Sequence, residues 1–276
     1  MGQNKTRLQQ NNTDLQSIKT TVESLPDLPT VTIDGVQQAG NLAFESELVS
    51  TLYDDLPYNF FYGSAVVLNN EIHILGGYYD SSSYKMHYKW NGSSWTKVST
   101  LPYNFYNGAA VVLNNEIHIL GTSHDSSIFK LHYKWNGTAW TSVSTLPYNS
   151  YNPRAAIVNN EIHILSVTSI DSLSSNHCKW NGSSWTLVST VQYRALYCTI
   201  AVLDNQIHIF GTSESPYKQH FVWTGSEWAG ASTLPYVAQI CQAVILNDEI
   251  HIMGSISTSS ARMHARIDAK VYKIAS

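Results

Sequence analysis

The tripeptide Ile-His-Ile recurs five times along this chain at a nearly constant interval. The copies begin at Ile72, Ile117, Ile162, Ile207 and Ile250, so the spacings are 45, 45, 45 and 43 residues. A fixed period of this length is typical of propellers and solenoids, because each repeat is one supersecondary unit that buries its apolar face against its neighbours. The period therefore constrains the fold more than any local pattern does.

One repeat, at residues 101–145, shows what each copy contains. Apolar or alternating segments of strand length are separated by pairs of turn-forming residues. The expected strands are Ala109–Leu113, Ile117–Gly121, Phe129–Trp135 and Trp140–Ser144, and the two tight turns are Asn114-Asn115 and Asn136-Gly137. Such residue pairs accept the positive φ angles that hairpin turns require. Four short antiparallel strands per repeat is the anatomy of a propeller blade.

The repeat resembles the kelch motif, which has a Gly-Gly doublet, then a Tyr, then a Trp seven positions later. Gly76-Gly77, Tyr88 and Trp95 match this pattern, and Tyr133 with Trp140 keeps the spacing, although the doublet is complete in one copy only. The resemblance implies an all-β, kelch-like β-propeller over residues 47–276. Five copies indicate five four-stranded blades. Fold resemblance of this kind does not by itself define a function.

Two segments compete to close the ring. Leu48–Leu52 has the sequence of a fourth strand (compare Val98–Leu101) and precedes the first full copy, whereas Lys270–Ile274 follows the last one. Either would complete the last blade and protect its edge strand, which would otherwise be open to aggregation. The sequence leaves both possibilities open.

Composition fits a β-rich recognition protein and argues against several other classes. The 276 residues include 17 Tyr and 8 Trp but only 13% charged residues. A net charge of −4 without a basic block argues against nucleic-acid binding. No apolar run is long enough to span a membrane, and residues 1–5 begin no signal peptide. The three cysteines, Cys178, Cys198 and Cys241, lack metal-site spacing, so we interpret them as small buried side chains.

Ten of the eleven histidines follow the repeat. Five belong to Ile-His-Ile, and five lie on the expected third strands; in the first three copies the two are 14 residues apart, as in His73 and His87. Across a hairpin this offset places both imidazoles on one face. A feature repeated with the framework indicates a structural, hydrogen-bonded histidine row rather than a catalytic or metal site, because two His without a carboxylate hold a metal poorly. We therefore expect acid to destabilise the protein.

The two ends of the blades differ in how much the copies vary. The end with the Asn-Asn and Asn-Gly turns is nearly uniform, whereas the opposite end, with the loops between blades, diverges and is rich in Tyr, Asn, Ser and Asp. Tyr supplies contact area at low entropy cost, and amides and carboxylates hydrogen-bond hydroxyls, a combination that suits glycans and proteins alike. The predicted ligand-binding residues are Tyr62, Tyr79, Asp80, Tyr106, Asn107, Asp125, Tyr151, Arg154, Arg194 and Tyr197.

No enzyme motif was found: the chain has no catalytic triad pattern, no Gly-rich phosphate loop and no zinc spacing. Asp80, Asp125, Asp171 and Glu214 occupy similar loops, and two converging carboxylates could serve glycoside hydrolysis. Loop aspartates more often cap local turns. We therefore expect a binding protein without catalytic residues, cofactor or metal.

Residues 1–26 differ in kind from the repeats. Leu8, Leu15 and Val22 are seven apart, with Asn11, Ile18 and Leu25 between them, and Pro26 ends the pattern. This heptad seam predicts a helix that forms a short coiled coil, with a trimer favoured, or docks on a partner as a single amphipathic helix. Residues 27–46 would form a neck.

The N-terminal segment, Asn11–Pro26, resembles the N-terminal helices of tail and baseplate proteins of phages that infect Gram-positive bacteria. With the divergent propeller face, the resemblance implies a phage tail receptor-binding protein, an adhesin for a bacterial surface glycan or protein. It would be made in the host cytoplasm, be located in the virion tail, contact other tail or baseplate proteins and insert into no membrane. Two alternatives stay open: an intracellular kelch-like protein-interaction adaptor, and a glycan-cleaving enzyme that uses the loop carboxylates.

Overall fold

The computed structural model describes residues 32–33, 36–37, 55–58, 60–77, 83–121, 129–169, 171–191, 193–211, 218–237, 241–253 and 264–268. The chain divides into two units, Met1–Tyr53 and Asp54–Ser276. In the first unit, β1 (Thr32–Ile33) pairs antiparallel with β2 (Val36–Gln37). The helix predicted for residues 1–26 and both candidate closing strands lie outside the described residues.

The second unit is all-β and consists of consecutive antiparallel sheets, each made from one sequence repeat. The first sheet contains β3 (Ser64–Leu68), β4 (Glu71–Leu75), β5 (Met86–Trp90) and β6 (Trp95–Thr100), with a 3-10 turn η1 (Ser83–Lys85) before β5. The second contains β7 (Ala109–Leu113), β8 (Glu116–Gly121), β9 (Leu131–Trp135) and β10 (Trp140–Ser142). The third contains β11 (Tyr151–Val158), β12 (Glu161–Val167), β13 (Ser175–Trp180) and β14 (Trp185–Val191).

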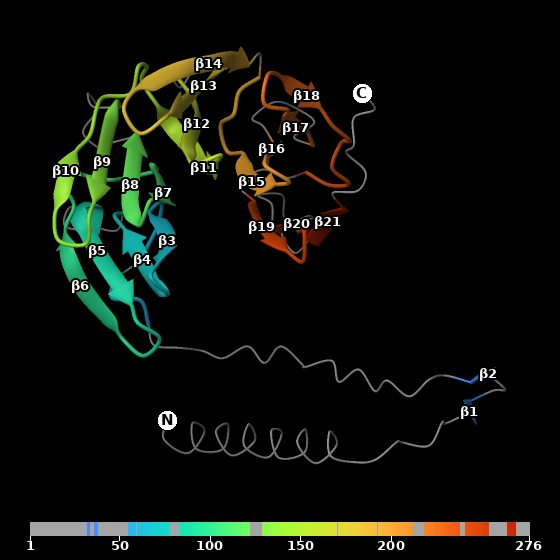
Figure 1. Ribbon diagram of the computed structural model, residues 1–276, viewed down its shortest axis with the longest axis horizontal. Coiled ribbons are helices and arrows are strands. Elements are labelled where there is room, and N and C mark those ends of the chain that lie inside the picture. Colours follow the sequence, from blue (N-terminus) through green and yellow to red (C-terminus); the bar gives the residue numbers. More distant parts are fainter. Residues whose placement is uncertain are drawn as a thin grey trace. The chain divides into compact units, whose positions relative to one another are not determined.

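The fourth sheet contains β15 (Thr199–Leu203), β16 (Gln206–Phe210), β17 (His220–Trp223) and β18 (Trp228–Gly230). In the described part of the last sheet there are three strands, β19 (Gln242–Leu246), β20 (Glu249–Met253) and β21 (His264–Asp268). The first strands of successive sheets are neighbours, in the order β3, β7, β11, β15, β19, and the sheets follow one another around a common centre (Figure 1). This arrangement is propeller-like, as the repeat predicts.

Tight turns join the first two strands of every sheet. Both residues of the Asn114-Asn115 turn have positive φ, 52° and 62°, and the equivalent pairs in the other four sheets are alike. Asn is the side chain that best tolerates this conformation after Gly. The sequence signal for these hairpins was therefore local and physically specific. The Asn-Gly turns are also built as predicted: the Asn136 Oδ1 accepts hydrogen bonds from Thr138 N, Thr138 Oγ1 and Ala139 N.

The apolar core lies between neighbouring sheets. Leu68 from the first sheet packs in one cluster with Ile117 and Ile119 from the second, and corresponding clusters join each later pair of sheets. The last described sheet differs from the sheets before it. Leu113, inside the series, is 5% exposed, whereas the equivalent Leu246 in the last sheet is 56% exposed. Packing against the next sheet therefore buries this position. The cysteines Cys178, Cys198 and Cys241 are free and buried, as expected.

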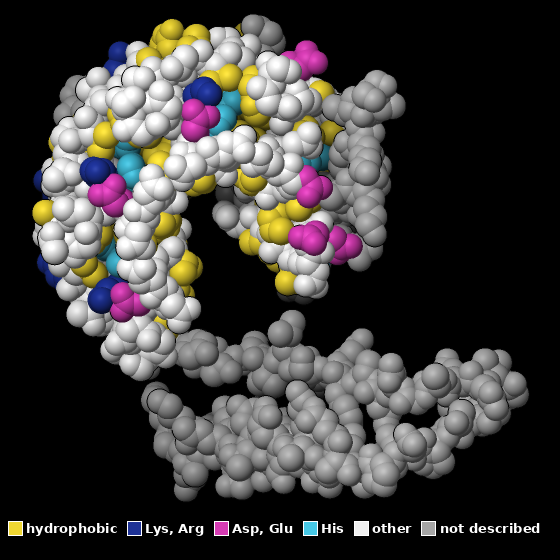
Figure 2. All heavy atoms as spheres, in the orientation of Figure 1, with side chains coloured by type: hydrophobic (Ala, Val, Ile, Leu, Met, Phe, Trp, Pro, Cys, Tyr) yellow, Lys and Arg dark blue, Asp and Glu magenta, His cyan; other side chains and the backbone are white. Residues whose placement is uncertain are grey.

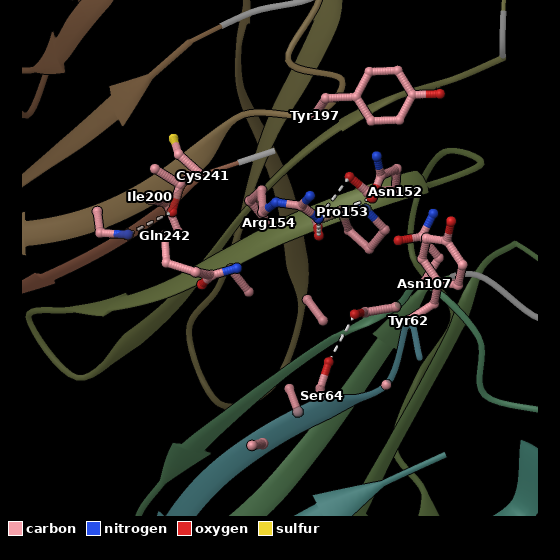
Figure 3. A pocket seen from close by; sticks show the side chains of 18 residues that line it. Tyr62, Ser64, Asn107, Asn152, Pro153, Arg154, Tyr197, Ile200, Cys241 and Gln242 are labelled. Carbon is pink, nitrogen blue, oxygen red and sulfur yellow. Dashed lines mark hydrogen bonds between the residues drawn. The ribbon is translucent and has the colours of Figure 1, made fainter. Parts of the chain in front are cut away.

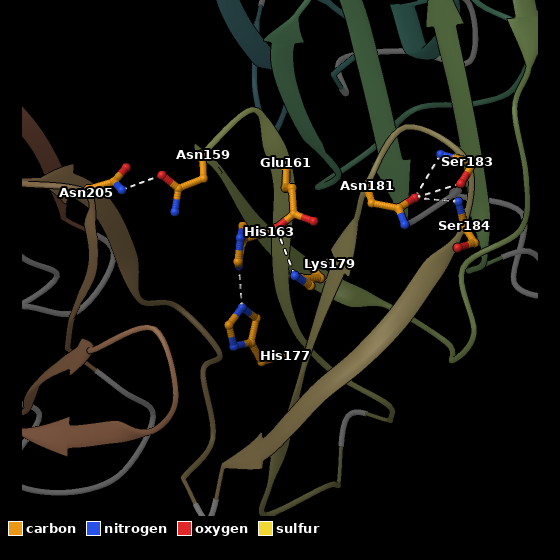
Figure 4. Close-up of polar contacts among 9 residues, drawn as sticks. All are labelled: Asn159, Glu161, His163, His177, Lys179, Asn181, Ser183, Ser184 and Asn205. Atoms are coloured by element: carbon orange, nitrogen blue, oxygen red, sulfur yellow. Dashed lines mark hydrogen bonds and ion pairs between the residues drawn. The ribbon is translucent and has the colours of Figure 1, made fainter.

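Each of the first four sheets contains a hydrogen-bonded pair of buried histidines, which confirms the structural interpretation of their geometry. His163 Nδ1 lies 2.8 Å from His177 Nε2 (Figure 4), and the other three pairs have the same atoms 2.8–3.0 Å apart. Burial, the largest cause, and the paired imidazole lower the pKa of the third-strand histidine in every pair to about 3. These histidines are His87, His132, His177 and His220. Burial also lowers the pKa of their second-strand partners.

The third-strand histidines also connect the sheets. His132 makes edge-to-face contacts with Trp180 and Trp185 of the next sheet, at centroid distances of 5.2 and 5.4 Å. His87 and His177 contact the equivalent Trp pairs in the same way. Edge-to-face ring packing is favourable beyond its buried area. Each such histidine is thus held by its partner within the sheet and by two indoles across the boundary.

The uniform end of the sheets carries a repeated ion pair beside these histidines. Lys179 Nζ lies 2.9 Å from Glu161 Oε2 (Figure 4), and Lys89–Glu71 and Lys134–Glu116 repeat the pair. Figure 2 shows the basic, acidic and histidine side chains gathered at successive positions on this face. Because the pairs are partly exposed, each contributes little stability.

Among the residues that the structure describes, there is no helix with the length and apolar character that a membrane span requires.

Candidate functional site

A cavity of about 880 Å³ lies where the first strands of all five sheets converge. It is lined by the beginnings of β3, β7, β11, β15 and β19 and by the residues just before them (Figure 3). These segments belong to the end of the sheets whose sequences diverge. The volume is in the range of small-molecule binding sites.

One position of the repeat forms the rim of this cavity. Tyr62, Asn107, Asn152 and Tyr197 are each 45 residues apart, all line the cavity, and all have positive φ, at 56°, 53°, 45° and 63°. Asn adopts this left-handed conformation readily, whereas for a bulky side chain it is an outlier that costs roughly 1–2 kcal/mol. Strain of this kind is concentrated at functional sites. The two tyrosines therefore occupy a backbone position that does not favour them.

The rim tyrosines present their rings to solvent. Tyr62 is 58% exposed and Tyr197 is 36% exposed, and each faces the space that Asn107 and Asn152 also border (Figure 3). Tyr106, another predicted contact residue, is half-buried and packs against Tyr62, with ring centroids 5.2 Å apart. An aromatic face next to side-chain amides can stack on an apolar surface and hydrogen-bond polar groups at its edge.

Arg154 is the one charged side chain among the described lining residues. Its Nε donates to the Cys198 carbonyl at 2.7 Å, and its Nη1 donates to the Asn152 Oδ1 and the Pro153 carbonyl, each at 2.9 Å. All these acceptors are uncharged. The guanidinium partly offsets the effect of burial on two nearby thiols, but burial wins: the pKa of Cys198 is raised, and that of Cys241 is raised to about 12. Both thiols are therefore protonated near neutral pH.

The structure brings four of the predicted contact residues, Tyr62, Asn107, Arg154 and Tyr197, to one cavity. It places three others nearby or elsewhere. Tyr106 supports Tyr62, Tyr151 is half-buried and stacks on Phe129 at 4.0 Å, and Arg194 is half-buried and is not among the lining residues. The remaining predicted residues, Tyr79, Asp80 and Asp125, lie outside the described residues.

Sequence reasoning missed several lining residues: Asn152, Ser64, Thr199 and Gln242. Asn152 was within reach, because it follows Asn107 by one full period and precedes Tyr197 by another. Aligning the repeats residue by residue, instead of comparing whole loops, places Asn152 at the same position as Asn107 and Tyr197. Thr199 and Gln242 lie at the starts of strands expected to be buried, and nothing in their type marks them as cavity residues.

Neither the cavity lining nor the histidine pairs form an obvious metal site. Within the described ranges, no group of three or more His, Cys, Asp or Glu side chains is arranged to hold a metal ion. The paired imidazoles already use one nitrogen on each other. The side chains that line the cavity carry hydroxyl, amide, guanidinium, thiol and aromatic groups, which can hydrogen-bond to a ligand or pack against it.

The fold and the cavity together define a propeller-like protein with a central, ligand-sized cavity. No protein-family profile and no curated protein sequence matches the chain. Its fold is similar to a solved structure described as "Structure of YjhT", with a TM-score of 0.64 and 11% sequence identity, over 77% of this chain and 82% of that one. At this identity the likeness concerns the fold alone. With the four-stranded sheets, it supports a β-propeller-like architecture.

Proposed function

We propose that this protein is a phage tail receptor-binding protein, an adhesin that recognises a bacterial surface glycan at the rim of the central cavity. The observation that carries the binding site is the pair of exposed tyrosines, Tyr62 and Tyr197, held at positive φ where the equivalent residues in the second and third sheets are Asn. A side chain kept in a strained backbone position is best explained by a role in contact.

A glycan fits the chemistry of the rim better than a flat protein surface does. Sugars present apolar ring faces and hydroxyl edges, and the rim places Asn107 and the buried Asn152 between the exposed rings of Tyr62 and Tyr197. A cavity of about 880 Å³ admits one or a few sugar units. A protein partner would instead need a contiguous surface of about 800 Å² from each side.

The rest of the proposal concerns assembly. The heptad seam of residues 1–26 would hold copies of the chain together, with a trimer favoured, and attach them to other tail or baseplate proteins. Several sites on one particle would bind a repetitive glycan by avidity, so each site could be weak. In this proposal the protein is located in the virion tail, has no catalytic role and needs no cofactor.

The test is binding of the fluorescently labelled protein to intact Gram-positive cells and to their purified surface glycans. The test variant is Tyr62→Asn/Tyr197→Asn, which gives the first and fourth sheets the residue already present in the second and third. The matched control is Tyr148→Asn, because Tyr148 is also exposed but does not line the cavity.

We expect strain-selective binding that the double variant loses by at least about tenfold and the control retains. Binding that survives in the double variant would move the site away from the rim. No binding to any cell or glycan, with the protein folded, would favour the adaptor alternative, which protein capture from a lysate then tests. Release of reducing ends from the bound glycan would instead favour a glycan-cleaving enzyme.

A further inference from the structure

One position of the repeat, two residues after the rim position, links the innermost strands of neighbouring sheets. Ser64 Oγ donates to the Gly108 carbonyl at 2.9 Å, and Arg154 Nε donates to the Cys198 carbonyl at 2.7 Å. Ser64 and Arg154 are two periods apart, and so are the two acceptors. The equivalent Thr199 makes a similar link, because its Oγ1 accepts from Ala243 N at 3.2 Å.

A hydroxyl is therefore sufficient for this link. Ser64 makes it to the same acceptor position as Arg154 does, and it places no charge in the cavity. The hydrogen bond between the sheets therefore does not explain why this position carries a charged arginine. Its guanidinium is always charged, and a partly buried charge costs free energy unless it is compensated.

That charge has no acidic partner among the described lining residues. The acceptors of Arg154 are the backbone carbonyls of Cys198, Pro153 and Asn152, at 2.7, 2.9 and 3.5 Å, and the side-chain amide oxygen of Asn152 at 2.9 Å. These dipoles orient the guanidinium plane and leave a net positive charge in the cavity, close to Asn152 (Figure 3). A fixed cation in a confined space attracts an anion more strongly than it would in open water.

We propose that the cavity selects a ligand with an anionic group, which Arg154 binds. The inference rests on the proposed glycan-binding function and adds its chemical class: an acidic glycan that carries a carboxylate, phosphate or sulfate. Because the hydrogen bonds described for the guanidinium come from Nε and Nη1, its Nη2 group is placed to donate charge-assisted hydrogen bonds to such a substituent. The rim tyrosines then contact the sugar that carries the anionic group.

The test compares an acidic oligosaccharide series, containing uronic acid, phosphorylated or sulfated sugars, with neutral counterparts of the same backbone. Binding is measured by titration calorimetry for the full chain and for two variants. Arg154→Ser copies the link that Ser64 already makes, so it removes the charge and keeps the contact between sheets. Arg154→Lys keeps the charge and removes the planar group. Circular dichroism and thermal melting establish that each variant is folded.

We expect the wild type to prefer acidic members, and the ratio of its affinity for acidic members to its affinity for neutral members to fall by at least about tenfold in Arg154→Ser. Arg154→Lys should fall between the two. Affinity for the acidic members should also drop when the salt concentration is raised from about 0.05 M to about 0.5 M, since exposed charge attraction is screened. The preference and its salt dependence are measured on the wild type, so they test the selection of an anionic ligand even if Arg154→Ser fails to fold, and Arg154→Lys then tests the residue.

Equal binding of acidic and neutral members, unaffected by salt and by Arg154→Ser, would overturn the inference and leave the glycan-binding proposal standing. Failure of the folded wild type to bind any member of either series would overturn both. Within the acidic series, the preferred substituent identifies whether carboxylate, phosphate or sulfate is the natural group.

Discussion

Acid should unfold this protein within a narrow pH range, because its sheets bury neutral histidines in series. His87, His132, His177 and His220 are at most 2% exposed, and burial holds their pKa at about 3. In the unfolded chain the same groups have a pKa near 6.5. Below about pH 6.5 the unfolded chain binds protons that the folded protein does not, so the free energy of unfolding falls as the pH falls. Above that pH both states are unprotonated at these histidines, and the full free energy of unfolding is present.

The magnitude follows from the two pKa values. Between about pH 7.5 and pH 5, each of the four histidines lowers the free energy of unfolding by about 2 kcal/mol, so together they lower it by about 8 kcal/mol. Their second-strand partners, whose pKa burial also lowers, add to this loss. A loss of this size is comparable to the whole stability of a typical domain, about 5–15 kcal/mol.

The assay is urea denaturation followed by tryptophan fluorescence at several pH values between these limits. The variant His132→Gln removes one of the four titrating groups, so the loss between the two pH values should shrink by about 2 kcal/mol whatever the variant costs at neutral pH. A midpoint that stays constant from pH 7.5 to pH 5 in the wild type would refute the reasoning, since it would mean that the folded protein takes up protons as readily as the unfolded chain.

Three further results are expected. Leu113→Ala should lower the free energy of unfolding by about 2–5 kcal/mol and the equivalent Leu246→Ala by less than about 1 kcal/mol, because only Leu113 is covered by a following sheet. Equal losses would show that Leu246 is covered in solution. Asn136→Ala should cost about 1 kcal/mol through its three lost turn hydrogen bonds, and a variant with an unchanged melting temperature would contradict this. Tyr197→Asn should leave stability unchanged or raise it by up to about 1 kcal/mol, because Asn tolerates the positive φ; a clear drop would mean that the ring is needed for packing.

Much of the fold could be predicted because its signals are local and repeated. The strand expected at Ala109–Leu113 is observed with those bounds, and the Asn114-Asn115 turn has the positive φ angles that its residues favour. The predicted third strand Phe129–Trp135 is shorter at its start, where β9 begins at Leu131. There the chain still belongs to the loop, since the Phe129 carbonyl accepts from Ser150 N and the Phe129 ring stacks on Tyr151.

The site was harder to predict, because it depends on how separate repeats converge. Tyr62 and Tyr197 were predicted to be contact residues from their type. That they line one cavity together with Asn152 depends on how the sheets are arranged in space, which the residue types do not show. β11 begins at Tyr151, earlier in its repeat than the other first strands, and its register shifts between Tyr151 and Arg154, around Pro153. The register shift around Pro153 occurs in one repeat only, so a comparison of the repeats in the sequence does not predict it.

The contacts between histidines and tryptophans make the sheet boundaries observable one at a time. At each of the first three boundaries, one buried and one half-buried indole pack against one imidazole, as Trp180 and Trp185 do against His132. Indole emission depends on its surroundings, and a protonated imidazole quenches it, so each boundary carries an intrinsic optical probe. Replacing one pair by Phe would silence a single boundary and leave the others emitting. The order in which the sheets separate, in acid or in denaturant, could then be followed without attaching any label.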